Sequence, residues 1–157
     1  MNNDKLSKSW LFVSLQIILL ALLIFLPSDD IIHSQMLKFL ATVFEITGIA
    51  LILVSAYGIR KSLTAMPLPK ENGKLQIHGL YTYMRHPMYT GVLLLSLGIA
   101  TNSGSLLKFS FVLGLLILFI FKAKFEESLL AKKYPNYESY KSKTAMFVPG
   151  FIIPKQK

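Results

Sequence analysis

Long runs of apolar residues constrain the fold of this chain more than any other feature of its sequence. Residues 10–26 form an almost unbroken apolar run, and residues 37–57 form a second one whose only charged side chains are Lys38 and Glu45. A helix needs roughly 17 to 25 mostly apolar residues to cross the hydrocarbon core of a bilayer. Since 53% of the 157 residues are hydrophobic, more than is usual for a soluble domain, the sequence predicts a membrane protein.

Two further apolar segments, 87–101 and 105–121, are separated by an uncharged turn signal, Thr101-Asn102-Ser103-Gly104-Ser105. They predict a tight helical hairpin whose first helix is only about 22 Å long at 1.5 Å per residue, shorter than the bilayer core. We therefore expect an all-α, polytopic membrane protein with about four transmembrane helices. The whole chain, 1–157, is expected to form one integral-membrane domain with a cytoplasmic C-terminal segment over residues 122–157.

The distribution of basic residues predicts the topology. The formal net charge is +9, and five Lys and Arg lie in residues 60–85 and eight after Phe121, whereas residues 27–36 hold none and carry two aspartates. The positive-inside rule then places both termini on the cytoplasmic side, in a cytoplasmic (inner) membrane. The charge is thus attributed to topology and anionic lipid, not to nucleic acid. A cleaved signal peptide is the alternative for residues 10–26, but no small-x-small cleavage pattern follows them.

Three charged residues inside or beside the apolar runs need partners. Glu45 is expected to face protein, either as a structural hydrogen-bond partner or as a proton or ligand contact. Lys38 and Lys108 are expected to snorkel at the outer edge of the membrane. The chain has no cysteine, and its three histidines show no metal-ligand spacing, so no metal site is expected.

A polar stretch over residues 79–91, set directly against an apolar run, is the first candidate for function. It ends a loop over residues 60–86 and holds Arg85, His86 and Pro87 among aromatic residues. By itself it could be a helix start with Pro87 in the first turn and basic residues at the headgroups. Tyr81 and Arg85 are four residues apart, however, and on a helical turn they would share a face. Amides exposed at the start of the following helix would also suit an anionic carboxylate.

A second candidate is the acidic pair Glu126-Glu127, which follows the last apolar run. Adjacent residues on a helix point about 100° apart, so the two carboxylates cannot serve one contact equally. One of them could be only a solvated partner of Lys122 or Lys124. A four-crossing topology brings this pair to the same membrane face as Arg85, and we expect the two polar groups to meet there.

These two motifs, in this order and spacing, resemble the isoprenylcysteine carboxyl methyltransferase and phospholipid methyltransferase superfamily. The resemblance rests on residues 79–91, on Glu126-Glu127-Ser128-Leu129-Leu130 and on Tyr134-Pro135-Asn136-Tyr137, and it covers the C-terminal half of the chain. It implies a membrane enzyme that binds S-adenosylmethionine between its last helices and the C-terminal segment. The residues implied to form the cofactor pocket are Tyr81, His86, Pro87, Tyr89, Gly91, Glu126 and Glu127. Arg85 would lie near the substrate or the methionine carboxylate.

The expected reaction is methyl transfer to a lipid-borne or small hydrophobic acceptor at the cytoplasmic face, with an isoprenylcysteine-like carboxylate as the first candidate. Arg85 could orient a carboxylate, whereas an amine acceptor would need a base such as Glu126 or Glu127; Arg85 and Glu127 are the catalytic candidates. The alternatives are an NADPH-dependent reductase of the sterol reductase type, which the C-terminal pattern also resembles, a non-enzymatic membrane scaffold, and a transporter. The sequence leaves the oligomeric state open.

Overall fold

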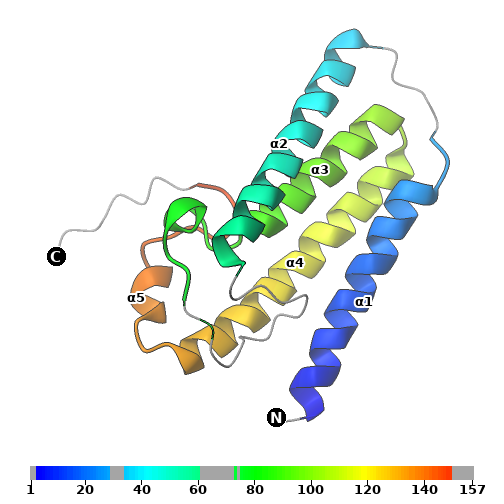
Figure 1. The fold of residues 1–157 in the computed structure, drawn as a ribbon. Helices are drawn as coiled ribbons and strands as arrows, with labels where there is room; N and C mark the ends of the chain where they lie inside the picture. The colour runs from blue at the N-terminus through cyan, green and yellow to red at the C-terminus, as the bar shows by residue number, and fades with distance from the viewer. Residues whose placement is uncertain (1–2, 29–33, 61–72, 74, 150–157) are drawn as a thin grey trace.

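The computed structural model describes residues 3–28, 34–60, 73 and 75–149, and within these ranges every regular element is helical. The helices run side by side in a slanted bundle, with the short α5 beside the lower end of α4 (Figure 1). Their bounds are α1 Asn3–Phe25, α2 Gln35–Ile59, the 3-10 turn η1 Gly79–Thr82, α3 Pro87–Ser103, α4 Leu106–Lys133 and α5 Tyr137–Lys141. The all-α prediction is confirmed.

Three of the helices, α1, α2 and α4, are long and apolar enough to cross a membrane. They have 23, 25 and 28 residues. Helix α3 has 17 residues, which gives a length of about 26 Å at 1.5 Å per residue, and it is shorter than the other three, as expected. Four crossings remain a prediction, because among the described residues only α1, α2 and α4 are identified as helices long and apolar enough to span a membrane.

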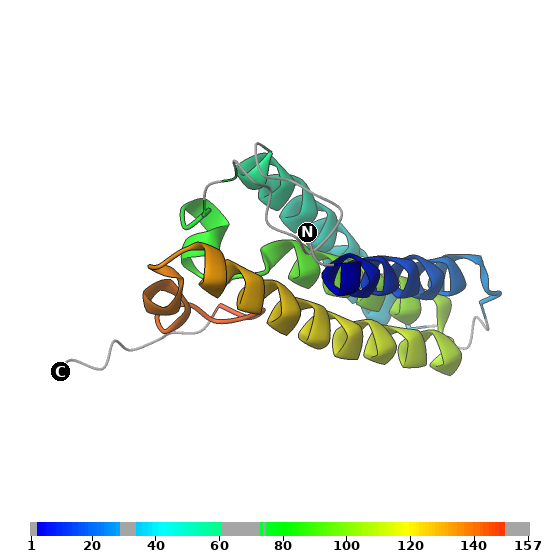
Figure 2. The same ribbon diagram turned by 90° about the horizontal axis from the view of Figure 1, so that it is seen from below.

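Helix α3 lies between α2 and α4, and its contact with α2 is very close (Figures 1 and 2). A Cβ atom added to Gly98 would lie 2.7 Å from the carbonyl oxygen of Ala41, and one added to Gly91 would lie 2.8 Å from that of Gly48. Small residues allow backbones of membrane helices to approach in this way. Glu45 packs on the same surface, since its Cγ would lie 2.6 Å from a Cβ at Gly98. The expectation that Glu45 faces protein is confirmed.

The predicted hairpin between α3 and α4 is present. Gly104 closes α3 in the left-handed conformation, with φ of 63°, and Ser105 precedes α4. Glycine adopts this conformation at little cost, which explains the sharp turn. Lys108 in the first turn of α4 is buried, and its Nζ lies 3.5 Å from Ser28 Oγ, beyond the end of α1. Its side chain is thus covered by protein, and its place at the outer edge of the membrane stays a prediction.

Helix α4 continues well past its apolar part, to Lys133. The C-terminal segment was expected to begin at residue 122, where the composition becomes polar. In the structure the same helix continues for 12 residues beyond Phe121. Helix α1 packs along α4, with the rings of Phe12 and Phe125 5.7 Å apart. Because α4 is continuous, the acidic pair lies on a rigid extension of a membrane helix.

Some expectations concern residues outside the described ranges. These are the aspartates of the first connection, residues 61–72 and 74 of the 60–86 loop, and the tail beyond Pro149. The apolar side chains that do lie in described helices are largely exposed along α1 and α2, among them Ile17, Phe39, Ile46 and Leu53. Such exposed apolar faces agree with contact to lipid.

Candidate active site

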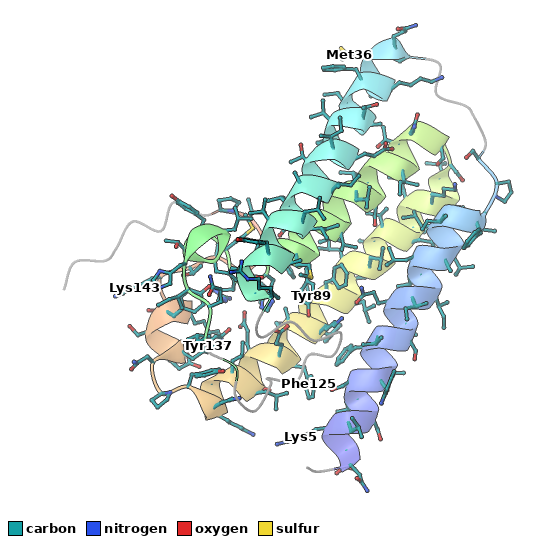
Figure 3. All side chains as sticks on the ribbon, in the orientation of Figure 1. Lys5, Met36, Tyr89, Phe125, Tyr137 and Lys143 are labelled. Carbon is teal, nitrogen blue, oxygen red and sulfur yellow. The ribbon has the colours of Figure 1, made fainter. Side chains whose placement is uncertain are left out.

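The two polar groups singled out from the sequence are in direct contact. Arg85 Nε lies 2.7 Å from Glu127 Oε1, and His86 Nε2 lies 3.2 Å from the same oxygen. The hydroxyl of Tyr89 donates to Glu126 Oε2 at 2.9 Å. The expected meeting of the two motifs is therefore confirmed. Figure 3 shows that Tyr89, Phe125 and Lys5 lie toward the end of the bundle opposite to Met36.

The chain approaches this site through a turn, not through a continuous helix. Gly79 has φ of 66° and starts η1, which ends at Thr82. Pro87 occupies the first turn of α3, a position that proline favours because its missing N–H is not needed there. The expectation that Tyr81 and Arg85 share a helical turn is wrong, because η1 ends before Arg85. The Tyr81 hydroxyl lies 3.5 Å from Ser55 O on α2, whereas Arg85 is directed to α4.

Glu127 lies in the polar C-terminal part of α4 and is buried, with 2% of its side chain exposed. In addition to Arg85 and His86, Lys141 Nζ lies 3.2 Å from its Oε2. Burial alone would raise the pKa of Glu127. Hydrogen bonds from His86 and Arg85, together with the Arg85 charge, outweigh that effect and lower the pKa to about 2. Glu127 is therefore an ionised, fully engaged carboxylate at neutral pH, and such a group is a weak base.

Glu126 has a different environment. Its side chain is 29% exposed, and Oε2 accepts the Tyr89 hydroxyl and lies 3.7 Å from His86 Nδ1. Its other carboxylate oxygen, Oε1, forms no hydrogen bond or ion pair with the described residues. Of the two acidic residues, Glu126 is thus the one with a carboxylate oxygen available to a ligand.

Aromatic rings line this part of the site. The ring of Tyr89 stacks on the imidazole of His86 at 5.2 Å and on the ring of Phe119 at 4.8 Å. Phe147, from the C-terminal part of the chain, also packs against His86, with ring centroids 6.1 Å apart. The stack fixes the orientation of Tyr89 and His86, so their polar atoms are held toward the acidic pair.

A C-terminal strap, residues Thr144 to Phe147, is tied to the start of α3. The backbone N–H groups of Arg85 and His86 donate to the carbonyls of Ala145 and Met146 at 2.8 and 3.0 Å. The Arg85 guanidinium also donates to the carbonyl of Thr144, and Thr90 Oγ1 donates to that of Phe147 at 2.7 Å. The role of the strap is not evident from the sequence, because its residues contribute mainly backbone carbonyls.

Two tyrosines connect η1 to the rest of the site. The Tyr140 hydroxyl donates to the carbonyl of Tyr81 at 2.6 Å. Burial raises the pKa of Tyr140, the Arg85 charge lowers it and the Glu127 charge raises it, with a result of about 12. Burial and then the Glu126 charge raise the pKa of Tyr81 as well. Both phenols are neutral donors at physiological pH.

Gly91 and Pro87, which the resemblance assigned to the cofactor pocket, are buried. Gly91 contacts α2, where an added Cβ would also lie 3.0 Å from the backbone nitrogen of Ile52. Helix packing is therefore sufficient to require glycine at this position. A contact of either residue with a cofactor stays a prediction.

A buried lysine adjoins the aromatic stack and was not assigned a role from the sequence. Lys122 is 4% exposed, and its Nζ donates to Gln16 Oε1 on α1 at 2.6 Å. The same ammonium lies 5.2 Å from the centroid of the Tyr89 ring. Neither Lys122 nor Lys124 forms an ion pair with the acidic residues in the described part of the chain, contrary to the routine pairing considered above.

Three apolar helices of membrane-spanning length, with a charged and aromatic cluster at one end of the bundle, define the chain as an integral membrane protein with an enzyme-like site. Residues 36–137 match the phospholipid methyltransferase family. The match covers more than half of the chain, which therefore belongs to this family of membrane methyltransferases, and the resemblance inferred from the two motifs is confirmed. A comparison with curated proteins finds no significant match. Helix α1, with Gln16, lies outside the matched residues.

Proposed function

We propose that this protein transfers a methyl group from S-adenosylmethionine to a lipid-borne acceptor at the cytoplasmic edge of the membrane. The observation that carries the proposal is the contact between the two motifs, Arg85 and His86 with Glu127 and Tyr89 with Glu126. The contacting residues are 37 to 42 positions apart in the sequence, yet they form one cluster. The cluster lies at the end of the bundle where α4 becomes polar, so a soluble donor and a lipid acceptor can both reach it.

The residues present fit such a donor. Glu126 offers a part-exposed carboxylate, and carboxylates suit ribose hydroxyls, as they do in dinucleotide sites. The neighbouring Tyr89 and His86 rings are stacked on each other, so their edges and the Tyr89 hydroxyl are what a nucleoside beside Glu126 would contact. We assign Glu126, Tyr89 and His86 to the donor site, with the Tyr81 backbone, Pro87 and Gly91 as its supporting frame.

Position and electrostatics account for the reaction. When bound, S-adenosylmethionine supplies a methyl group on a positively charged sulfur. The fixed stack of His86 and Tyr89, and the carboxylate of Glu126, orient the reactants without a covalent intermediate. Glu127 and Arg85 hold α4, the start of α3 and the strap together. We therefore assign these two residues to positioning the site, in place of the direct catalytic roles expected from the sequence.

The state of Arg85 favours an amine acceptor over a carboxylate. Its Nε and Nη1 already donate to Glu127 and to the carbonyls of Lys141 and Thr144. A carboxylate acceptor oriented by Arg85 would have to displace these partners. An amine acceptor makes no such demand on Arg85, and it agrees with membership in a phospholipid methyltransferase family. As the amine nitrogen bonds to the methyl carbon, the carbon–sulfur bond would break with its electron pair going to sulfur, and the proton lost from nitrogen would pass to solvent at the part-exposed side of the site beside Glu126.

The test is to incubate membranes containing the protein with methyl-labelled S-adenosylmethionine and to separate the products into lipid, peptide and volatile pools. We expect label in the lipid pool and, after headgroup hydrolysis, on nitrogen. Label on a carboxyl-methylated peptide would restore the isoprenylcysteine hypothesis. A protein that transfers no label, and whose melting temperature rises with NADPH and not with S-adenosylmethionine, would be a reductase.

Two variants separate the proposed roles of the acidic residues. Glu126→Gln should weaken donor binding while leaving the melting temperature near that of the wild type. Glu127→Gln should instead lower the melting temperature, because it leaves Arg85 buried without a carboxylate. If Glu126→Gln lowers only the rate at saturating donor, Glu126 acts on the acceptor's proton and the assignment to the donor is wrong.

A further inference from the structure

Lys122 is a buried charged residue near the site that the proposed reaction does not use. It lies on α4, one helical turn before the acidic pair, and it is 4% exposed. Its Nζ donates to Gln16 Oε1 at 2.6 Å, and the Tyr89 ring lies 5.2 Å away. The ammonium thus lies where α1, α3 and α4 meet.

Lys122 forms no ion pair in the described ranges: no carboxylate oxygen there lies within 4.0 Å of its Nζ. The Glu126 charge acts on the ammonium only from beyond that distance. A side-chain amide is a neutral acceptor and offsets only part of the cost of burying an ammonium. Buried charges in proteins are normally paired. Lys122 is therefore a buried cation that could bind an anionic group of a ligand.

Helix α1 fixes the position of this cation. Gln16 is a polar residue within an apolar run of α1, and its contact with Lys122 explains why it is placed there. About one turn nearer the polar end of α4, the Phe12 and Phe125 rings close the contact between α1 and α4. The other neighbour of the ammonium is the Tyr89 ring, whose hydroxyl contacts Glu126, so an anion bound by Lys122 would lie beside Tyr89 in the proposed site.

We propose that Lys122, oriented by Gln16, binds an anionic group of a ligand in this active site, either the carboxylate of the methyl donor or the phosphodiester of a phospholipid acceptor. The inference rests on the proposed function and deepens it. It also gives α1, which lies outside the family-matched residues, a direct part in ligand binding. One ammonium fits either anion, because both present oxygen acceptors with a full negative charge.

The first arm of the test measures donor binding in nanodiscs by calorimetry, with S-adenosylmethionine and with decarboxylated S-adenosylmethionine. If Lys122 binds the donor carboxylate, Lys122→Gln should weaken binding of the complete donor about tenfold or more. The decarboxylated donor should bind both proteins alike. Lys124→Gln is the matched control, because Lys124 is exposed two residues further along the same helix.

The second arm measures retention of dioleoyl phosphatidylethanolamine by native mass spectrometry. If Lys122 binds the acceptor phosphodiester, Lys122→Gln should need about tenfold more of this lipid for half-occupancy than the Lys124→Gln control, with donor affinity unchanged. If neither donor nor lipid affinity distinguishes Lys122→Gln from Lys124→Gln, the inference is wrong.

A stability measurement excludes a purely structural role. The double variant Gln16→Leu/Lys122→Met replaces the polar pair by apolar side chains of similar size. If the pair exists to bind an anion, the ligand-free double variant should melt at the wild-type temperature or higher, while its ligand affinity falls. A lower melting temperature with unchanged affinity would show that the pair only holds α1 to α4.

The outcome for this site is separable from that for the proposed function. If the wild type binds no S-adenosylmethionine and transfers no label, the proposed function fails. If the wild type is active and Lys122→Gln behaves as Lys124→Gln does, only the inference about Lys122 fails.

Discussion

Substituting Glu127 by Gln should destabilise the protein more than any other single charge-removing change at the site. The change keeps the shape of the side chain and removes its charge. Glu127 Oε1 is contacted by Arg85 at 2.7 Å and His86 at 3.2 Å, and Oε2 by Lys141 at 3.2 Å. The amide retains one oxygen acceptor, but its NH₂ group turns a donor toward one of these cations.

The expected loss is about 3 kcal/mol of unfolding free energy, because removing one partner of a buried ion pair costs roughly 3 to 5 kcal/mol and Gln keeps one acceptor. Arg85 and Glu127 carry this effect, since their side chains are 9% and 2% exposed. Lys141 is 39% exposed and adds little, because solvent screens its charge.

The assay is SDS-induced unfolding in mixed micelles, with Glu138→Gln as the control because Glu138 is an exposed carboxylate on α5. The folded-state pKa of Glu127 is depressed to about 2 from 4.5. The contribution of Glu127 to the unfolding free energy should therefore be complete above pH 4.5 and disappear as the pH falls toward 2. A Glu127→Gln protein within 0.5 kcal/mol of the Glu138→Gln control, an ordinary surface effect, would refute this account of the ion cluster.

Three further predictions concern packing, the donor site and pH. Gly98→Ala should cost about 1 to 3 kcal/mol, because its Cβ would overlap a backbone oxygen of α2; Gly114→Ala, with 3.5 Å of clearance, should be neutral in the same SDS titration. Tyr89→Phe keeps the ring stack but loses the hydroxyl bond to Glu126, so calorimetry should show donor affinity reduced about threefold to tenfold; unchanged affinity would contradict the assignment. The pKa of Tyr140 is raised to about 12, against 10 when unfolded, so its contribution to the unfolding free energy is complete below pH 10 and lost between pH 10 and 12. Tyr140→Phe should reduce the loss of unfolding free energy with pH in that range. An unaltered pH dependence would show that this phenol is not the titrating group.

The meeting of the two motifs could be predicted from the sequence because topology alone decides it. The positive-inside rule predicts residues 60–85 and the segment after Phe121 on one membrane face, and the hairpin closed by Gly104 brings α3 and α4 together. The extension of α4 to Lys133 was missed because composition, and not helix-breaking residues, was used to end it. No Gly or Pro occurs between Phe121 and Pro135, and that was the available signal.

Other features depend on packing that the sequence pattern does not specify. The different states of Glu126 and Glu127 follow from which carboxylate faces Arg85, and adjacent residues carry no sign of this. The burial of Lys122 depends on Gln16 of α1, 106 residues away. Tyr81 and Arg85 were expected on one turn because their spacing permits it, but η1 is too short to include both.

Donor binding to the wild type and to Glu126→Gln tests the central claim most directly. Calorimetry in nanodiscs should show saturable binding of S-adenosylmethionine to the wild type and none of NADPH. Glu126→Gln should bind the donor about tenfold more weakly with an unchanged melting temperature. Equal donor affinity of the two proteins, or no donor binding to the wild type, would contradict the claim that the paired motifs form a methyl-donor site.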